Sequence, residues 1–250
     1  MLDPYAIILI SFVSFWASYF GSLAGGGGLV VTPVLLSFGL PVPVALGTRR
    51  LSTISGIAFG LVQFYKFKKV DFKFGLNIAG FTLAGCLIGY LIVDMVNDYW
   101  LKKIIGFLIV ALAVVLFFEE TERVRSIKGR LFRHKRIVGP PLAVSAGCWM
   151  VLIGGGGGTV MTYILIIVYG QTILESAGNR RLPLLAGSLL ATVLFIWGGY
   201  IHYPLAIAML AANSLGGWFG SRFYLKKGED KVKTIFFVII IILGLKTALF

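Results

Sequence analysis

Residues 24–51, AGGGGLVVTPVLLSFGLPVPVALGTRRL, and residues 155–182, GGGGTVMTYILIIVYGQTILESAGNRRL, decide the fold of this chain. A shift of 131 residues brings them into register without a gap. A glycine run, a single glycine (Gly39 and Gly170) and a Gly-x-Arg-Arg-Leu pentapeptide then each meet their counterpart. Chance matches between glycine-rich and leucine-rich segments would not readily keep all three features in one register. The sequence therefore predicts an internal repeat, with two copies of one structural unit.

The composition excludes an ordinary soluble domain. Hydrophobic residues make up 58% of the 250 residues and charged residues 13%, with a mean hydropathy of +0.93. Soluble domains carry roughly 25% charged residues. Long apolar stretches recur along the chain, each close to the length that crosses about 30 Å of hydrocarbon. We therefore expect an all-α polytopic protein of the cell (inner or plasma) membrane.

The net charge of +13 would indicate nucleic-acid binding in a soluble protein. In a membrane protein it is better explained by Lys and Arg on cytoplasmic loops. We therefore expect no nucleic-acid partner, and we expect the basic linker at residues 119–137 to lie against anionic membrane lipid.

Each predicted half has the same plan of an apolar arm, a glycine run, a short apolar piece and three longer helices. The expected segments are 5–23, 29–39, 46–65, 74–95 and 101–118 in the first half, and 138–153, 160–170, 176–197, 204–223 and 232–249 in the second. Each short piece spans about 16 Å at 1.5 Å per residue, too little to cross a bilayer. We therefore expect each arm and short piece to form a broken helix or a re-entrant hairpin inside the membrane. The resulting units are a first transmembrane repeat at 1–118, a basic cytoplasmic linker at 119–137 and a second transmembrane repeat at 138–250.

Loop charges predict that the two repeats have inverted topology. The loop that carries Lys66, Lys68, Lys69 and Lys73 is basic, whereas its counterpart at residues 198–204 contains no Lys or Arg. Equivalent loops of opposite charge character are expected on opposite sides of the membrane, with the basic loops and the linker cytoplasmic. Both termini are then expected outside. Inverted repeats are the usual construction of secondary transporters, whose substrate site lies at the repeat interface.

Four arginines are the candidate substrate-binding residues of greatest interest: Arg49, Arg50, Arg180 and Arg181. Each Arg at the centre of a membrane helix costs about 2.5–3.5 kcal/mol. Glu175 is the only acidic residue near either pair in the sequence, so an anionic substrate is the expected counter-charge and Glu175 a possible coupling residue. Guanidinium groups suit the oxygen arrays of sulfonate, sulfite, phosphate or carboxylate. The alternative is a structural role, in which an Arg extends to the interface or binds helix-end carbonyls.

The glycine runs supply the other candidate binding residues, because glycine permits close backbone approach and a helix beginning after each run would direct N–H groups at the cavity. These candidates, with the polar residues beside the arginines, are Gly26, Gly27, Gly28, Thr48, Gly157, Gly158, Thr159 and Asn179. The alternative for the glycines is tight helix crossing. No catalytic residue, metal site or cofactor is expected, because Cys86 and Cys148 form neither a disulfide framework nor a zinc-ligand spacing.

The ordered string Gly25–Gly28, Pro33, Gly39, Pro41, Ala45 and Gly47-Thr48, with its partial echo from Gly154 to Asn179, resembles the sulfite exporter TauE/SafE family of membrane permeases. The resemblance covers essentially the whole chain. It implies transport of small anions such as sulfite, sulfoacetate and other organosulfonates, or thiosulfate. Many relatives have a small hydroxyl residue where Arg49 and Arg180 stand, so the resemblance implies an anion and leaves its identity open.

The expected function is a secondary transporter, a permease or exporter, that moves a small anion by alternating access at the repeat interface. A passive anion channel is the alternative within transport. A phospholipid-handling membrane enzyme is a further alternative, because arginine clusters and glycine loops also bind phosphate. It would need metal-binding carboxylates or a positioned base, for which Glu175 alone is a poor candidate. A membrane scaffold would leave the matched arginine pairs unexplained. We therefore expect a transporter and not an enzyme, of unknown oligomeric state.

Overall fold

The computed structural model describes residues 3–117 and 134–227, and within these ranges the regular structure is entirely α-helical. The described part of the first half contains five helices: α1 (Pro4–Ala24), α2 (Gly28–Ser37), α3 (Val42–Lys66), α4 (Phe72–Met95) and α5 (Asp98–Phe117). The described part of the second half contains another five: α7 (Lys135–Ile153), α8 (Gly157–Tyr169), α9 (Ile173–Asn179), α10 (Arg181–Trp197) and α11 (Tyr203–Lys227).

Four apolar segments are long enough to cross a membrane among the described residues: Pro4–Ser22, Phe72–Met95, Lys135–Ile153 and Ile173–Trp197. Helices α2 and α8 are shorter, with 10 and 13 residues. They therefore span about 15 and 20 Å at 1.5 Å per residue, less than the hydrocarbon thickness. The predicted polytopic all-α membrane architecture is confirmed.

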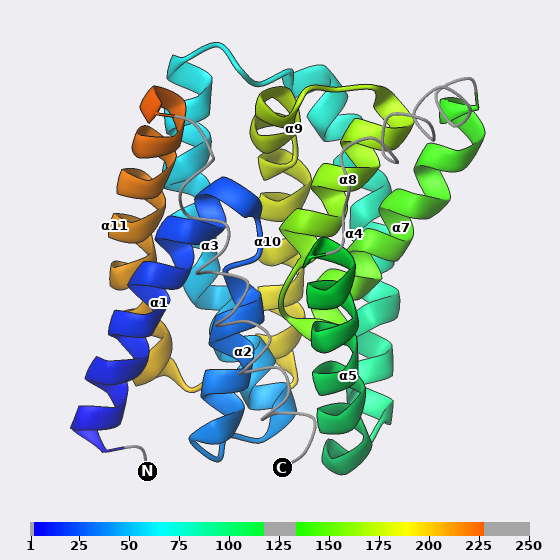
Figure 1. Ribbon diagram of the computed structural model, residues 1–250. Helices are drawn as coiled ribbons and strands as arrows, with labels where there is room; N and C mark the ends of the chain where they lie inside the picture. The colour runs from blue at the N-terminus through cyan, green and yellow to red at the C-terminus, as the bar shows by residue number, and fades with distance from the viewer. Residues whose placement is uncertain (1–2, 118–133, 228–250) are drawn as a thin grey trace.

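Both short helices follow a turn that only glycine readily makes. Helix α1 ends at Gly25 with φ +80°, and α7 ends at Gly154 with φ +69°. These angles lie in the left-handed region, where a side chain is strained and glycine is not. Each turn reverses the chain inside the helix bundle, so α2 runs back along α1 and α8 runs back along α7 (Figure 1).

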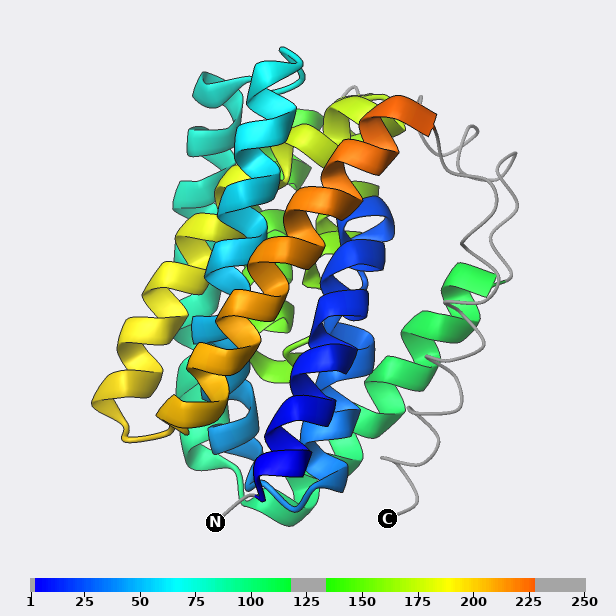
Figure 2. The ribbon, with the colours of Figure 1, turned by 90° about the vertical axis from the view of Figure 1, so that its left-hand side faces the viewer.

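The helices of the two halves interleave. Helix α1 packs against α11, and the two lie side by side in Figure 2. Helix α4 packs against α7, α3 against α11, and α10 against both α3 and α4. The crossings are close because small residues stand at them: a Cβ on Gly85 would come within 3.0 Å of the Val144 carbonyl oxygen, and one on Gly216 within 3.0 Å of the Phe15 carbonyl oxygen. The glycines of α4 and α11 therefore serve helix packing.

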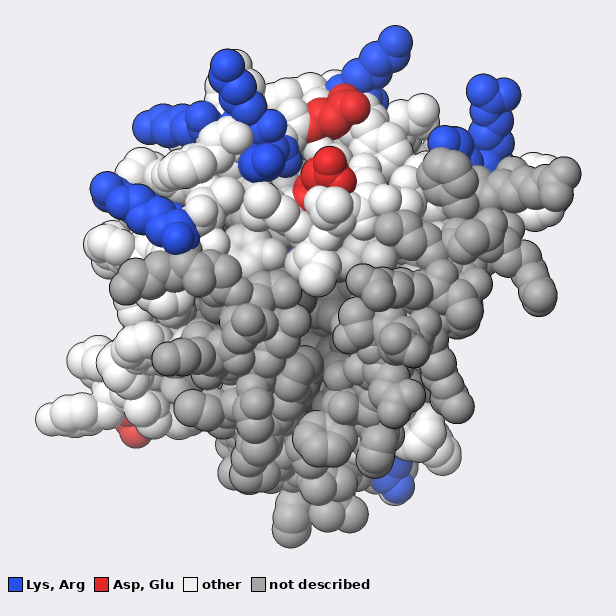
Figure 3. Space-filling model, turned by 45° about the horizontal axis from the view of Figure 1, so that its top comes forward, with Lys and Arg blue, Asp and Glu red and all other residues white. Residues whose placement is uncertain are grey.

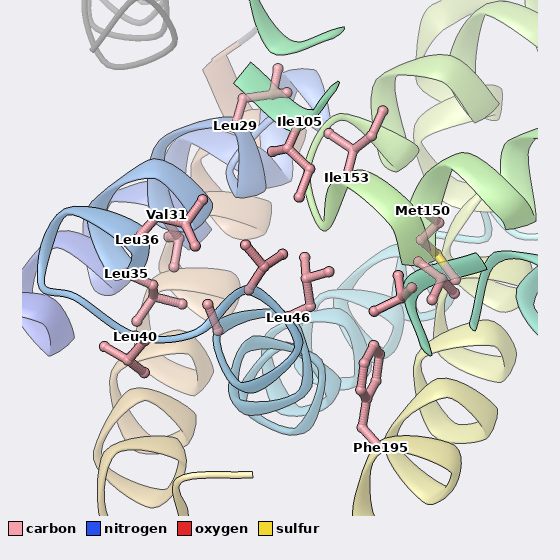
Figure 4. Close-up of a cluster of buried hydrophobic side chains, with 14 of the residues drawn as sticks. Leu29, Val31, Leu35, Leu36, Leu40, Leu46, Ile105, Met150, Ile153 and Phe195 are labelled. Carbon is pink, nitrogen blue, oxygen red and sulfur yellow. The ribbon is translucent and has the colours of Figure 1, made fainter. Parts of the chain in front are cut away.

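A large apolar cluster fills the space around α2. Leu29 and Leu35 of α2, Leu46 of α3, Ile105 of α5 and Phe195 of α10 are all fully buried in it, and Figure 4 shows them with their neighbours. This cluster holds α2 between α3 and α5. It thereby positions the glycine turn at the start of α2.

Most of the described Lys and Arg side chains outside the core gather at one end of the molecule, at the top of Figure 1, which we call the basic end. Figure 3 shows blue side chains around that end. The exposed or half-buried basic residues at the helix ends and loops there are Lys66, Lys68, Lys69, Lys73, Lys135, Arg136, Arg222 and Lys226. The first residue of α1 and the loop between α10 and α11 lie at the opposite end (Figure 1). The loops that carry Lys68 and Tyr200 are thus at different ends of the bundle.

The helix expected at 176–197 is interrupted in the structure. Helix α9 ends at Asn179 and α10 begins at Arg181, with Arg180 between them. Pro183 explains the break, because it has no N–H to donate to the carbonyl of Asn179 four residues earlier. Ser52 stands at the equivalent place in the first half, and α3 continues through it.

Two other helices begin earlier in the structure than the sequence predicted. Helix α3 begins at Val42 and not at residue 46, so Arg49 and Arg50 lie about two turns inside it. Helix α7 begins at Lys135, so the last three residues of the expected linker 119–137 are already helical. The remainder of that linker falls largely outside the described residues, as does the expected helix 232–249.

Candidate functional site

The two glycine turns and the two arginine pairs enclose a cavity of about 110 Å³. Roughly 10–15 Å³ of such volume holds one water molecule, so the cavity has room for a small polyatomic ion. Its walls come from both halves of the chain. The arginines and glycines that line it are Arg49, Arg50, Arg180, Arg181, Gly21, Gly25, Gly27, Gly28, Gly56, Gly154, Gly156, Gly157 and Gly158.

The glycine turns lie in direct contact with each other at this cavity. A Cβ on Gly25 would come within 3.0 Å of Gly158, and one on Gly155 within 3.0 Å of Gly28. Neither turn could carry a side chain at these places without moving its partner. The tight-packing role that the sequence left open for the glycine runs is therefore part of their function.

Three glycines also make room for guanidinium groups. A Cβ would come within 3.0 Å of Arg180 if placed on Gly25, of Arg49 if placed on Gly28, and of Arg181 if placed on Gly60. The glycines thus let charged side chains lie flat against backbone in the interior. Close backbone approach, rather than chain flexibility, explains why glycine stands there.

Arg180 and Arg181 are bonded to the protein. The Nη2 atoms of both donate to the carbonyl oxygen of Ser22, at 3.3 and 3.4 Å, near the end of α1. Arg180 Nη1 donates to the hydroxyl of Thr162 and, at 3.4 Å, to the carbonyl of Gly158. This pair therefore joins α10 and the chain just before it to α1 and α8.

Arg181 has two further partners. Its Nη2 donates to the Ser221 hydroxyl at 3.0 Å, and its guanidinium carbon lies 4.5 Å from the centre of the Phe64 ring. A guanidinium over an aromatic face is stabilised by the negative charge of the ring face. The second pair is thus bonded to the protein through its Nη atoms, although the buried Nε of Arg181 has no partner among the described residues.

Arg49 and Arg50 differ from the second pair. Their side chains are only 7% and 3% exposed. The Nε and Nη1 atoms of Arg49 and the Nε and Nη2 atoms of Arg50 are buried, and none of them has a hydrogen-bond partner among the described residues. An unsatisfied buried donor costs about 1–3 kcal/mol, and more when it is charged. The first pair lines the cavity and is short of hydrogen-bond partners among the described residues, so its charge is available to a ligand there.

No carboxylate is among the described residues that line the cavity. The four guanidinium groups are instead supplemented by the N-terminal ends of two helices. Helix α2 begins at Gly28 and α8 at Gly157, and both residues line the cavity. Helix N-termini carry partial positive charge and unpaired N–H groups, so they add to the attraction for an anion.

A family model described as "Sulfite exporter TauE/SafE" matches residues 10–247 of this sequence. The chain belongs to this family. It is 27% identical to a "Probable membrane transporter protein" of Haemophilus influenzae over 236 residues, which cover 93% of this chain and 89% of the relative. It is 26% identical to "Probable membrane transporter protein YfcA" of Escherichia coli K12 over 251 residues, which cover 98% and 91% of the two chains.

A third relative, "Probable membrane transporter protein YdhB" of Bacillus subtilis, is 25% identical over 229 residues, covering 89% of this chain and 91% of the relative. No solved structure matches the chain. Family membership and the apolar helices indicate a multi-pass membrane protein of a transporter family, which implies a small-molecule substrate.

Eight of the twelve substrate-binding residues expected from the sequence line the cavity of this family member: Arg49, Arg50, Arg180, Arg181, Gly27, Gly28, Gly157 and Gly158. The other four do not. The carbonyl of Gly26 accepts from Leu29 N within the first turn of α2, at 2.8 Å. Thr159 is buried in the first turn of α8.

Thr48 and Asn179 hold loops in place. Thr48 Oγ1 accepts from the backbone N–H of His202 at 2.9 Å, and Asn179 Oδ1 accepts from that of Asp71 at 2.7 Å. Thr48 is directed at the loop before α11 and does not line the cavity, whereas its neighbour Arg49 does. These two polar residues anchor the loop before α11 and the loop before α4.

Glu175 is exposed and does not line the cavity. Its Oε2 accepts from the backbone N–H of Thr172 at 2.8 Å, while Thr172 Oγ1 accepts from Glu175 N at 3.2 Å. This reciprocal pair is a capping box at the start of α9. Glu175 therefore caps α9 and does not lie beside the arginines as the coupling carboxylate that the sequence suggested.

Several lining residues were not assigned to the site from the sequence, notably Ser188, Thr53 and Leu184. Each follows an arginine by three, four or seven positions on the same helix, a spacing that places side chains on one helix face. That spacing could have identified them. Asn213 of α11 donates from Nδ2 to the Ser52 carbonyl of α3 at 3.1 Å and also lines the cavity.

The two arginine pairs should differ in their effect on stability. Arg181→Gln removes bonds to Ser22 and Ser221 and should lower the free energy of unfolding by about 1–3 kcal/mol. In a protein of this size each 1 kcal/mol lowers the Tm by about 2–4 °C. Arg50→Gln removes a buried charge with unsatisfied donors, so its Tm should equal or exceed that of the parent when no oxyanion is added. Thermal unfolding of the purified variants in detergent measures both. Equal losses in the two variants would contradict the distinction between the pairs.

Proposed function

We propose that this protein is a secondary transporter of a small oxyanion, sulfite or an organosulfonate, which binds in the arginine cavity. The observation that carries the proposal is that Arg49 and Arg50 line a cavity with no carboxylate among its described lining residues, and that both keep buried donors without a partner in the described part of the chain. A bound oxyanion would supply both the missing acceptors and the missing negative charge. The family description, a sulfite exporter, is consistent with such a substrate.

The chemistry of the cavity favours an oxygen-rich anion over a bare halide. A guanidinium group binds two oxygen atoms of one anion through two parallel hydrogen bonds. Ser188 also lines the cavity, and its buried hydroxyl has no partner among the described residues. Leu184, Ile57 and Met150 form apolar walls, which suit the short carbon segment of an organosulfonate.

The proposal includes two inverted repeats, 1–118 and 138–250, that are joined by a cytoplasmic linker. The repeat register pairs α1 with α7 and α4 with α11. If each helix is replaced by its counterpart, the contact of α1 with α11 becomes the contact of α7 with α4. These two helix contacts are among the most extensive in the described structure. Likewise the contact of α3 with α11 becomes that of α10 with α4. Helices α1 and α7 run in opposite directions in Figure 1, which supports inversion.

The basic end is assigned to the cytoplasm, because Lys and Arg concentrate on cytoplasmic loops. The N-terminal end of α1 then faces outward, at the opposite end of the bundle. With three crossings and one hairpin in each repeat, the C-terminus also lies outside. The location proposed is the cell membrane.

Unequal bonding of the two arginine pairs supports alternating access. The second pair is bonded to the Ser22 carbonyl and has one buried donor, Arg181 Nε, without a partner among the described residues, whereas the first pair has four such donors, although the repeats place the pairs at equivalent positions. In an inverted-repeat carrier the opposite-facing state exchanges the roles of the two repeats. Release of Arg180 and Arg181 from α1 is accordingly part of the transport cycle. Glu175, exposed at the basic end, has no assigned role in coupling.

Removal of a guanidinium group from Arg49 or Arg50 should weaken substrate binding. Arg49→Gln or Arg50→Gln loses charge-assisted hydrogen bonds of about 1.5–3 kcal/mol, which corresponds to a roughly 10- to 100-fold weaker apparent affinity. Uptake and counterflow of labelled sulfite into proteoliposomes, kept free of oxygen, measures this. Lys103→Gln, an exposed cation at the opposite end, is the matched control. Wild-type affinity in correctly inserted Arg49 and Arg50 variants would refute the site, and linear uptake without counterflow would indicate a channel.

The topology can be tested by accessibility. Single cysteines at Lys68 and at Tyr203, in a background with Cys86→Ala and Cys148→Ala, should react from opposite sides with a membrane-impermeant maleimide. In intact cells only the cysteine at position 203 should be labelled, and permeabilisation should expose the one at position 68. Labelling of both from the same side would overturn the inverted arrangement.

A further inference from the structure

A second hollow lies on the side of the bundle, between α4, α7 and the end of α8. It has a volume of about 340 Å³. Its lining residues are Phe74, Asn77, Ile78, Phe81, Lys135, Arg136, Pro140 and Tyr169. None of them lines the arginine cavity, so the hollow is a separate feature, which we call the α4–α7 groove.

The groove has a charged rim and an apolar floor. Lys135 and Arg136 form the first turn of α7, and the dipole of that 19-residue helix adds partial positive charge at the same point. The floor is built from aromatic and aliphatic side chains, with the rings of Phe74 and Tyr169 packed edge to face, 5.0 Å apart. Gly139 admits the Tyr169 hydroxyl against α7, since a Cβ there would come within 3.0 Å of it.

The position of the groove fits a membrane interface. Its rim belongs to the basic end, and its floor continues into apolar side chains that face outward from the bundle. Phe81 is 37% exposed, Leu76 60% and Ile137 75%. A ligand that occupied both parts would need an anionic head and an apolar tail, because a free anion would leave the aromatic floor in water.

Two prolines add hydrogen-bond acceptors at the rim. Pro140 and Pro141 lie inside α7 and have no N–H, so the helix supplies no donor to the carbonyls of Arg136 and Ile137, four residues earlier. A headgroup that carries hydroxyls could donate to these oxygens while its phosphate binds the two cations.

We propose that the α4–α7 groove binds one anionic phospholipid with a hydroxyl-bearing headgroup. The phosphate lies on Lys135, Arg136 and the start of α7, and the acyl chains run along Phe81 and the outer face of α4. Basic pockets between transmembrane helices on the cytoplasmic side are suited to such headgroups.

The site is connected to the arginine cavity through one helix. Helix α7 begins at the groove, and its other end, at Met150 and Gly154, lines the cavity. A lipid that holds the first turn of α7 in place therefore restrains a helix whose other end lines the transport site. The lipid proposal stands on the groove alone and does not require the assigned substrate.

The test is lipid binding to the purified full-length protein in neutral detergent. Native mass spectrometry should show one phosphatidylglycerol retained over phosphatidylcholine of the same acyl chains. The double variant Lys135→Gln/Arg136→Gln should weaken that adduct by about tenfold or more. Arg136→Gln alone, an exposed change that spares the fold, should weaken it by a smaller factor. Lys66→Gln/Lys68→Gln removes the same charge from the same end and should change the adduct less than twofold.

Three results would overturn the proposal. The first is equal retention of the anionic and zwitterionic lipids. The second is an equal loss in the Lys66/Lys68 control, which would indicate general charge attraction. The third is stabilisation by soluble glycerol phosphate that matches the stabilisation by phosphatidylglycerol, which would indicate a free-anion site. Transport of sulfite is not a readout here, so failure of the lipid site and failure of the proposed substrate are distinguishable.

Discussion

Four guanidinium groups buried between membrane helices, with no carboxylate among the described residues that line their cavity, set the constraint on which the rest of this structure depends. Charge in a hydrocarbon environment must be offset by hydrogen bonds, by helix termini or by a ligand. The hydrogen bonds are provided unequally: Arg180 and Arg181 are bonded to Ser22 and other groups, whereas Arg49 and Arg50 keep four buried donors without a partner among the described residues, against one on Arg181. That imbalance is what makes the cavity a binding site and not only a polar element of the core.

The glycine turns follow from the same constraint. Guanidinium groups reach the interior only where no side chain occupies the space, as at Gly28 beside Arg49 and Gly60 beside Arg181. The turns also allow α2 and α8 to begin inside the bundle, so their N-terminal ends reinforce the positive field. Short helices, left-handed glycines and paired arginines are thus parts of one arrangement. Each of these features would destabilise the folded protein if the others were absent.

Much of this was predictable from the sequence, because hydropathy marks helices in a membrane and an uncompensated Arg pair in an apolar run requires explanation. The membrane architecture, the short helices after the glycine runs and the convergence of eight of the expected binding residues on one cavity could be predicted in this way. The break at Arg180 was missed because hydropathy continues across it, although Pro183 carried the signal. The carbonyl of Ser22 could not be found at all, since a backbone oxygen leaves no trace in residue identity. Glu175 was misplaced because nearness in sequence to an arginine is not nearness in space when a capping box turns the side chain to solvent.

The most direct measurement is an experimental structure of the protein with selenite, a heavier analogue of sulfite, located by its anomalous scattering. The account predicts one strong peak inside the cavity, within hydrogen-bond distance of the guanidinium groups of Arg49 and Arg50. Selenite found only at the exposed basic end, with those two side chains bonded to ordered water in an otherwise unchanged cavity, would contradict it.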